Sequence, residues 1–241
     1  MQTTVKKTIK MSGVGLHSGI TSNLTISPAS AEYGIWFRQT DVIDGDNLIP
    51  ARYDAVNNTK LCTRISNSNG AEVSTIEHLM ASLAGTGVHN AIIEIDGPEV
   101  PIMDGSSAPF VSAILRAGLQ KLDAPIRAIR VLEPVSVMID DFEVSLSPCE
   151  TLKIDFEISY DDAAIGHQEK KLNMANGTFV RELSNCRTFG KLCDVDHLQS
   201  IGLALGGSLD NAIVVDNGII LNPEGFRRVD ECVGHKMLDV L

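Results

Sequence analysis

The residues best suited to chemistry lie near the end of the sequence, in Val229-Asp230-Glu231-Cys232-Val233-Gly234-His235-Lys236-Met237-Leu238-Asp239. Its apolar residues recur at intervals of four and three, which predicts a helix over residues 229–240. His235 and Asp239 are four residues apart, so they lie on one face about one turn apart. An imidazole nitrogen and a carboxylate oxygen are ordinary zinc ligands, but a catalytic zinc needs three protein ligands and an open position for water. The pair therefore requires a third ligand from elsewhere.

Taken alone, this pair has a simpler interpretation. A His-x-x-x-Asp spacing on a helix usually marks a surface hydrogen bond or ion pair. Cys232 lies three residues before His235 and could face the same ion, although a small buried cysteine in the core is the commoner case.

A second reactive group lies in Ser74-Thr75-Ile76-Glu77-His78-Leu79-Met80-Ala81-Ser82-Leu83, whose apolar spacing predicts a helix. Ser74 and Glu77 match a capping box, so Glu77 can simply cap the helix, and His78 can be a solvent-facing or core histidine. A carboxylate beside an imidazole on a first turn is also the arrangement of a metal site with a general base. The spacing alone leaves both interpretations open.

The composition indicates a globular protein of one large or two small domains: 241 residues, 44% hydrophobic and 21% charged. The net charge of -11 and the absence of a basic run interleaved with aromatics disfavour binding to nucleic acid. Five cysteines, an odd number without a C-x-x-C, favour a reduced cytosol over a disulfide framework. We expect neither a signal peptide nor a membrane span, because no apolar run is long enough.

The expected elements describe an α+β pattern that occurs twice, with a boundary at Lys121-Leu122-Asp123-Ala124-Pro125. Gly13-Val14-Gly15-Leu16-His17-Ser18-Gly19 lacks the third glycine and the helix of a dinucleotide fingerprint, so that interpretation is rejected. Turns are expected at Ser68-Asn69-Gly70, Asn176-Gly177 and Asp216-Asn217-Gly218. Besides the two helices above, helices are expected after Ser106 or Ser107, with Pro109 in the first turn, and over 192–205. Strands are expected at 3–10, 23–27, 35–38, 61–65, 71–73, 91–95, 128–132, 136–139, 143–146, 152–158, 212–215 and 219–221.

Six motifs in this order resemble a known family. They are Gly13-Val14-Gly15-Leu16-His17, Ser74-Thr75-Ile76-Glu77-His78-Leu79, Pro101-Ile102-Met103-Asp104-Gly105-Ser106, Cys186-Arg187-Thr188-Phe189-Gly190, Leu205-Gly206-Gly207-Ser208 and His235-Lys236-Met237-Leu238-Asp239. Together they resemble the UDP-3-O-acyl-N-acetylglucosamine deacetylases, zinc hydrolases of lipid A (lipopolysaccharide) biosynthesis in Gram-negative bacteria. The resemblance extends from the N-terminus to Leu241.

The resemblance implies the metal and the catalytic residues. The ligands would be His78, His235 and Asp239, holding Zn²⁺, with Fe²⁺ also suited to them. Glu77 would be the general base, Thr188 would stabilise the oxyanion, and Lys236 would add positive charge beside the active site. Among substrate-binding residues, Phe189 would line the sugar site and His17 would border the cleft.

The resemblance also implies the fold: two similar α+β domains, each a sheet with helices, with the helices sandwiched between the two sheets. We expect an N-terminal domain over residues 1–124 and a C-terminal domain over residues 125–241. A β-α-β insert in the second domain would form an acyl-chain tunnel. Its walls would be side chains that could equally be ordinary core: Leu192, Val195, Ala204, Leu209 and Val214.

Family members continue past the position of Leu241, with a histidine that acts as general acid for the leaving amine or stabilises the oxyanion, and an aspartate that orients it. None of the six histidines here matches that role; His89, His167 and His197 fall elsewhere. We therefore expect a C-terminally truncated second domain, with lower stability and activity than a complete family protein. The alternatives are a remnant that binds metal or UDP-acyl-sugar without turnover, and a different sugar or amide hydrolase. We expect a monomeric cytoplasmic protein that meets the membrane at most peripherally.

Overall fold

The computed structural model describes residues 1–140 and 142–241 and has the mixed α+β composition expected from the sequence. In the first part of the chain, a five-stranded sheet has the order β2-β3-β9-β4-β5. Within this sheet β4 and β9 are parallel, and the other neighbouring strands are antiparallel. Two smaller sheets, β1-β10 and β6-β7-β8, complete this part. The strands are β1 (Thr3–Val5), β2 (Ile9–Val14), β3 (Thr21–Pro28), β4 (Ile35–Gln39), β5 (Leu48–Pro50), β6 (Val56–Asn58), β7 (Arg64–Ser66), β8 (Glu72–Val73), β9 (Ala91–Ile95) and β10 (Leu119–Lys121).

The core of this part lies on one face of the five-stranded sheet. Residues of β3 alternate between buried and exposed, so Leu24 and Ile26 point into the core while their neighbours face away. Ile93 and Ile95 of β9 join them in a cluster with residues of helices α1 (Glu77–Thr86) and α2 (Ala108–Ala117). A short 3-10 turn, η1 (Tyr53–Ala55), precedes β6.

The two helix starts differ in how well the sequence predicts them. Ser107 is the N-cap residue of α2 and Pro109 lies in its first turn, as expected. The predicted capping box of α1 is wrong: the helix begins at Glu77, with Ile76 at the N-cap and no side-chain cap bond. Ser74 is instead held in an extended pairing with Glu99, where its N–H donates to the Pro98 carbonyl.

The second part of the chain contains two antiparallel hairpins, β11–β12 and β13–β14, and a three-stranded sheet, β15-β16-β17. β15 and β16 are parallel and α3 connects them, so these elements form the expected β-α-β unit. The elements are β11 (Val135–Ile139), β12 (Phe142–Leu146), β13 (Lys153–Ser159), β14 (His167–Asn173), η2 (Phe179–Leu183), β15 (Phe189–Lys191), α3 (Leu192–Ser200), β16 (Ile213–Asp216), β17 (Ile219–Ile220) and α4 (Glu231–Leu238).

Several predicted elements of the sequence are shorter than expected or absent. Residues 128–132 form no strand, because this exposed connection pairs with no other segment that the structure describes. The 61–65 strand is reduced to β7, although its hairpin with β8 is confirmed. The 192–205 helix ends at Ser200, and after the Asn176-Gly177 turn the chain forms the single turn η2.

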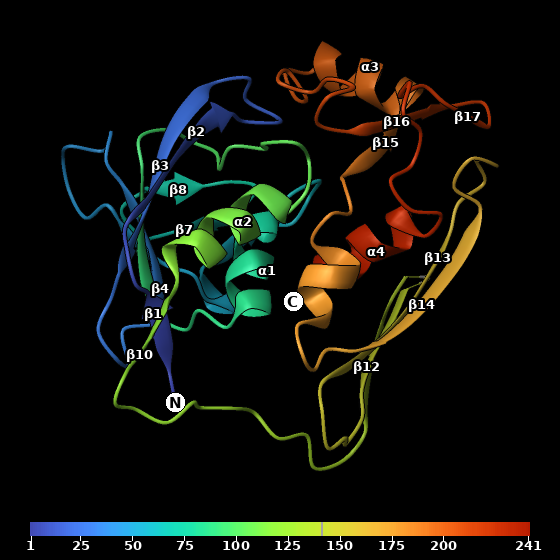
Figure 1. The fold of residues 1–241 in the computed structure, drawn as a ribbon. Coiled ribbons are helices and arrows are strands. Elements are labelled where there is room, and N and C mark those ends of the chain that lie inside the picture. The colour runs from blue at the N-terminus through green and yellow to red at the C-terminus, as the bar shows by residue number, and fades with distance from the viewer. Residues whose placement is uncertain (141) are drawn as a thin grey trace.

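Helices α1 and α2 lie on the inner side of the N-terminal sheets and face α4 and η2, while the β13–β14 ribbon covers the opposite side of α4 (Figure 1). A second core cluster joins the two parts: Ala81 and Val111 contact Phe179, Leu183 and Met237. The division into two domains at residues 124 and 125 remains our proposal.

The β11–β12 hairpin carries a group of uncovered apolar side chains. Every described residue of its strands is exposed, and Phe142 is 73% exposed and Ile139 63%. The expectation that this part of the chain is less stable than a complete family protein stays a prediction. Among the described residues, no helix has the length and apolarity that crossing a membrane requires.

A close approach between the two parts provides a test of this packing. A Cβ added at Gly85 of α1 would lie 2.1 Å from Cδ1 of Phe179, whose side chain is 1% exposed. Alanine is about 1 kcal/mol better than glycine inside a helix, but forced overpacking costs about 1–3 kcal/mol. We expect Gly85→Ala to lower the free energy of unfolding, measured by chemical denaturation. Ala84→Ser, at the exposed neighbour, should stay within about 0.5 kcal/mol, and a stabilised Gly85→Ala chain would contradict the contact.

Candidate metal centre

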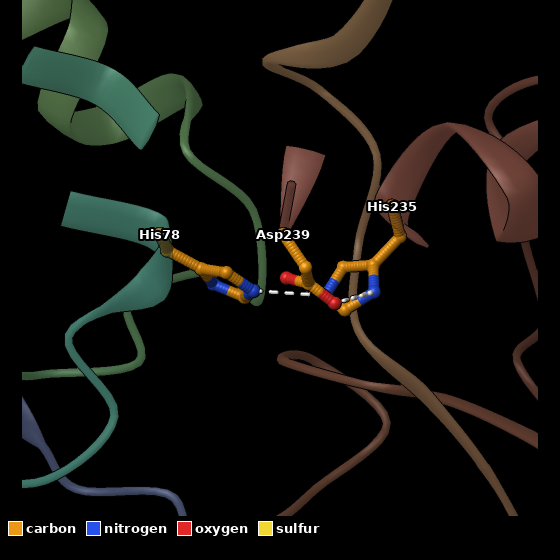
Figure 2. A group of neighbouring side chains, drawn as sticks. All are labelled: His78, His235 and Asp239. Carbon is orange, nitrogen blue, oxygen red and sulfur yellow. Dashed lines mark hydrogen bonds and ion pairs between the residues drawn. The ribbon is translucent and has the colours of Figure 1, made fainter. Parts of the chain in front are cut away.

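The two histidines predicted as metal ligands meet between α1 and α4. Nε2 of His78 lies 2.8 Å from Nε2 of His235, and the rings are nearly perpendicular at 84°. The carboxylate of Asp239 lies beside them, with Oδ2 3.5 Å from Nδ1 of His235 (Figure 2). One ligand atom of each residue lies within 4.8 Å of the others, so the three form one candidate site. The predicted i,i+4 pair and the histidine of the Glu-His dipeptide are therefore brought together.

Burial keeps both imidazoles neutral. Each histidine is 4% exposed, and desolvation lowers the pKa of His78 and lowers that of His235 to about 3. A neutral imidazole is the form that binds a metal. Nδ1 of both rings is buried without a hydrogen-bond partner among the described residues. Buried polar atoms normally have partners, so this pair of rings is incompletely satisfied by the protein alone.

The third group of the site is ionised. Burial works against the charge on Asp239, yet its pKa lies below the usual value because positive charge nearby stabilises the carboxylate: His235 when it is protonated, and Lys236 at neutral pH, where His235 is neutral. Lys236 Nζ donates to Asp239 Oδ2 over 2.9 Å. Two neutral imidazoles and one carboxylate are a donor set that suits zinc, and iron as well. The residues present therefore fit the metal that the motifs imply.

A cavity of about 300 Å³ opens onto these groups. The predicted catalytic residues Glu77, Thr188 and Lys236 all line it, as does Phe189. The ring of Phe189 packs edge-on against His235, with centroids 5.9 Å apart, and Lys236 Nζ lies 5.8 Å from its centre. One concave surface thus holds a metal-ligand set, a carboxylic acid, a hydroxyl and an ammonium group.

Glu77 is held by the backbone rather than by a basic side chain. Thr63 N–H donates to its Oε2 over 3.0 Å. Burial raises the pKa of Glu77 to about 7, because desolvation of the carboxylate outweighs the hydrogen bonds that favour its charge. A carboxylate with a pKa near neutrality is suited to accept and return a proton. The predicted role of Glu77 as a helix cap receives no support, since it makes no capping bond.

A second cavity, of about 370 Å³, adjoins the first and shares Thr188, Phe189 and Gly190 with it. Its walls come mainly from β15, α3, the loop that follows α3, and β16, and they are mostly apolar. His17 lines this cavity but not the first. The five residues predicted for an apolar tunnel all line it: Leu192, Val195, Ala204, Leu209 and Val214.

Other residues of the site escape sequence reasoning. Tyr160 follows β13 and lines the first cavity, where it packs edge-on against Phe189 with centroids 5.5 Å apart. Thr75 and Lys191 line it too. No spacing pattern marks Tyr160, and the amide of Thr63 carries no side-chain signal. Thr75 lies within a recognised motif and Lys191 directly follows one, so their place in the sequence is the one available signal.

Comparison with known proteins gives a consistent result. A family profile described as UDP-3-O-acyl N-acetylglycosamine deacetylase matches residues 2–241. The chain is 48% identical over 240 residues to the UDP-3-O-acyl-N-acetylglucosamine deacetylase of Phenylobacterium zucineum (strain HLK1), covering 100% of this chain and 82% of that protein. It is 45% identical over 242 aligned residues to the protein of that name from Pasteurella multocida (strain Pm70), covering 100% of this chain and 79% of the relative. A relative of the same name from Vibrio cholerae serotype O1 (strain ATCC 39541 / Classical Ogawa 395 / O395) is 46% identical, with the same coverage.

The ligand set predicts one tightly bound divalent metal per chain. His235→Ala removes one of three donors, so metal affinity should fall by more than the roughly 10- to 100-fold that loss of an outer-shell partner costs. Elemental analysis after dialysis against a weak chelator should find metal in the native chain and almost none in the variant. His197→Ala, at an exposed histidine of α3, is the matched control and should keep its metal. Full metal content in His235→Ala would eliminate the proposed ligand set.

Proposed function

Because the chain belongs to the UDP-3-O-acyl-N-acetylglucosamine deacetylase family, we propose that it hydrolyses the N-acetyl group of a UDP-3-O-acyl-N-acetylglucosamine and releases acetate. This reaction would serve lipid A biosynthesis in the cytoplasm, with a monomeric chain acting on a small-molecule substrate. The observation that carries the proposal is the convergence of Glu77, His78, His235 and Asp239 on one cavity, in a chain that matches the family over residues 2–241.

His78, His235 and Asp239 would hold the metal, which we propose to be zinc. A bound zinc ion supplies Lewis acidity, lowering the pKa of water and polarising the amide carbonyl. Glu77 lies in the same cavity and is the carboxylate placed to take a proton from the attacking water. Because Thr63 N–H occupies Oε2, Oε1 is the oxygen left for that proton. The side chain can then return the proton to the leaving amine, which departs poorly unless protonated.

Thr188 and Lys236 would stabilise the negative charge that develops on the carbonyl oxygen. Thr188 is fixed through its backbone: its N–H donates to the Gly105 carbonyl over 2.8 Å, and its carbonyl accepts from Ile213 N–H over 2.8 Å. Because the backbone of Thr188 is held on both sides, its side chain would start from a fixed position as a donor to an oxyanion. Lys236 contributes positive charge, and its ammonium is already oriented by Asp239. Phe189, between the two cavities, is placed to contact the sugar.

The adjoining apolar cavity would receive the 3-O-acyl chain. Leu192, Val195 and Leu209 line it, and its lining is more apolar than that of the cavity beside the metal ligands. Burial of methylene groups stabilises such a complex by about 0.8 kcal/mol for each group removed from water. His17 lies at this cavity and would border the bound substrate.

Two alternatives make different predictions for the native chain. A remnant that binds metal or UDP-acyl-sugar without turnover would show ligand binding but no acetate release. A different sugar or amide hydrolase would release product from another substrate. Assays of acetate release and of binding, with the metal-loaded chain and the UDP-acyl-sugar, separate all three. Turnover supports our proposal, binding without turnover supports the first alternative, and the absence of both binding and turnover supports the second.

Replacement of Glu77 tests the proposed base. Glu77→Ala should keep its metal, because Glu77 is outside the ligand set, but should lose about a hundredfold or more in kcat, the usual contribution of a general base. Acetate release is measured at matched metal content. Glu72→Ala, at a partly exposed glutamate paired with Arg64, is the control and should retain activity. Near-native turnover in Glu77→Ala would reduce Glu77 to a structural partner of the Thr63 amide.

The acyl cavity is tested by filling it. Leu209→Trp adds volume to a wall that belongs to this cavity and not to the metal-side cavity. We expect kcat/KM to fall for long-chain substrates relative to short-chain ones, by about 10- to 200-fold, the range for small steric changes in an apolar pocket. Leu205→Trp is a matched control, because Leu205 is 54% exposed and lines neither cavity. An equal loss for both chain lengths would place the acyl group elsewhere.

A further inference from the structure

A buried ion pair lies next to the metal centre without lining either cavity. Arg187 has the largest fully buried side chain in the described part of the molecule, and the side chain of Glu231 is 0% exposed. Arg187 donates from Nε to Glu231 Oε1 over 2.8 Å and from its backbone N–H to the same oxygen over 3.0 Å. Its Nη2 reaches Glu231 Oε2 at 3.3 Å. The two residues are therefore joined by three bonds in a fixed relative orientation.

The remaining polar atoms of the pair are also bonded. Arg187 Nη1 donates to Glu224 Oε1 over 2.5 Å, and Nη2 donates to the Gly225 carbonyl over 2.8 Å. Glu231 Oε2 accepts from Arg227 N–H over 2.6 Å. A buried ion pair satisfied in this way contributes little to stability compared with apolar residues of similar volume. The more specific contribution of this pair is orientation, because the planar guanidinium of Arg187 fixes the direction of the Glu231 carboxylate as well as its distance.

Both residues stand directly before functional groups in the chain. Arg187 immediately precedes Thr188 and Phe189, which line the cavity beside the metal ligands. Glu231 is the first residue of α4, one turn before His235 and two turns before Asp239. A displacement of this helix start would therefore move two of the three proposed metal ligands relative to Thr188.

The pair belongs to a closed path of contacts that leads to the third ligand. Arg227 donates from Nη2 to Asp104 Oδ2 over 3.0 Å, and the next residue, Gly105, accepts from Thr188 N–H. Ser107, in the same loop, donates from Oγ to the His78 carbonyl over 2.8 Å. The loop has little room to shift, since a Cβ at Gly105 would lie 2.0 Å from the Asn211 carbonyl oxygen.

We propose that Arg187 and Glu231 are positioning residues of the metal centre: they fix the start of α4 and thereby set His235 and Asp239 opposite His78. His78 and His235 lie 157 positions apart in sequence, on different helices, so tertiary contacts must define their separation. The apolar cluster packs the helices together, and the path of bonds adds a fixed direction. The inference rests on the proposed function for its activity readout alone, because metal coordination is observable without substrate.

Two single substitutions test the orientation and the charge of the ion pair one at a time. Arg187→Lys keeps the charge but loses the planar fork, and Glu231→Gln keeps the shape but loses the charge. In each, metal affinity, measured by competition with a chelator, should fall about 10- to 100-fold, as for other residues that orient metal ligands. The visible absorption spectrum of the Co²⁺-substituted chain should shift, because it reports ligand geometry. In the zinc form kcat should fall with KM little changed, since neither side chain lines the cavities.

A double substitution removes instability as an explanation. Arg187→Met with Glu231→Met replaces the ion pair by apolar groups, and such exchanges are often neutral or stabilising. We expect this chain to unfold at a temperature near that of the native chain yet to keep an altered Co²⁺ spectrum. Arg228→Met is the matched control: Arg228 pairs with Glu182 and Asp230 beside the same helix start but is 32% exposed. It should leave the spectrum and the metal affinity unchanged.

The outcomes are decisive in both directions. A folded double variant with the native spectrum and affinity would overturn the proposal, and so would a double variant that cannot fold, because the pair would then serve folding rather than placement. An Arg228→Met spectrum shifted as far as that of Glu231→Gln would overturn it too. A native chain that binds Co²⁺ but never releases acetate would refute the proposed function, while the spectra still decide the positioning role.

Discussion

The candidate site depends on the removal of two imidazoles from water. His78 and His235 are held Nε2 to Nε2 in a desolvated junction, where burial disfavours the protonated form of both rings and neither Nδ1 has a hydrogen-bond partner among the described residues. Such an arrangement costs free energy unless a further group binds these atoms, because buried polar atoms without partners are unfavourable. It persists because α1 and α4 are fixed by other contacts: the shared apolar cluster around Phe179, and the bonded path through Asp104, Arg227 and Glu231.

The sequence predicts local structure well where short-range chemistry determines it. Ser107 and Pro109 define the start of α2, and the Asp216-Asn217-Gly218 turn joins β16 to β17. It fails where a longer-range contact decides. Ser74 has the identity of a helix cap, but the chain pairs it with Glu99, and Thr75 adopts a left-handed φ of 58° before α1 begins. Residues 128–132 carry a strand pattern, yet a strand needs a partner and the described chain supplies none.

The residues of the candidate site also fall into two groups, those that local sequence predicts and those that only the fold brings to the site. Helical spacing places His235 and Asp239 on one face without any knowledge of the fold, and the Glu77-His78 dipeptide is visible as a candidate base and ligand. That these two groups share one site follows from the resemblance and from the fold, because periodicity carries no information about contacts between distant helices. The amide of Thr63 and the ring of Tyr160 reach the site through tertiary structure alone, and no pattern in the sequence predicts them. Arg187 stands inside a recognised motif, but its partner Glu231 lies 44 positions away.

Desolvation shifts the pKa of three groups of the site, with different consequences for the histidines and for the glutamate. It lowers the pKa of His78 and of His235, which keeps both as neutral donors, and it raises the pKa of Glu77 to about 7, which gives a carboxylic acid the proton affinity of a base at neutral pH. The same burial would disable Asp239 as a ligand if its charge were not supported, and Lys236 supplies that support from one turn away. A dication among these ligands would add positive charge beside Glu77 and lower its pKa again. The bonded positions of Glu77 and of the proposed ligands would therefore decide how far the proposed base retains its affinity for the proton. On this proposal, the placement of α4 against α1 sets the acid–base chemistry as well as the coordination.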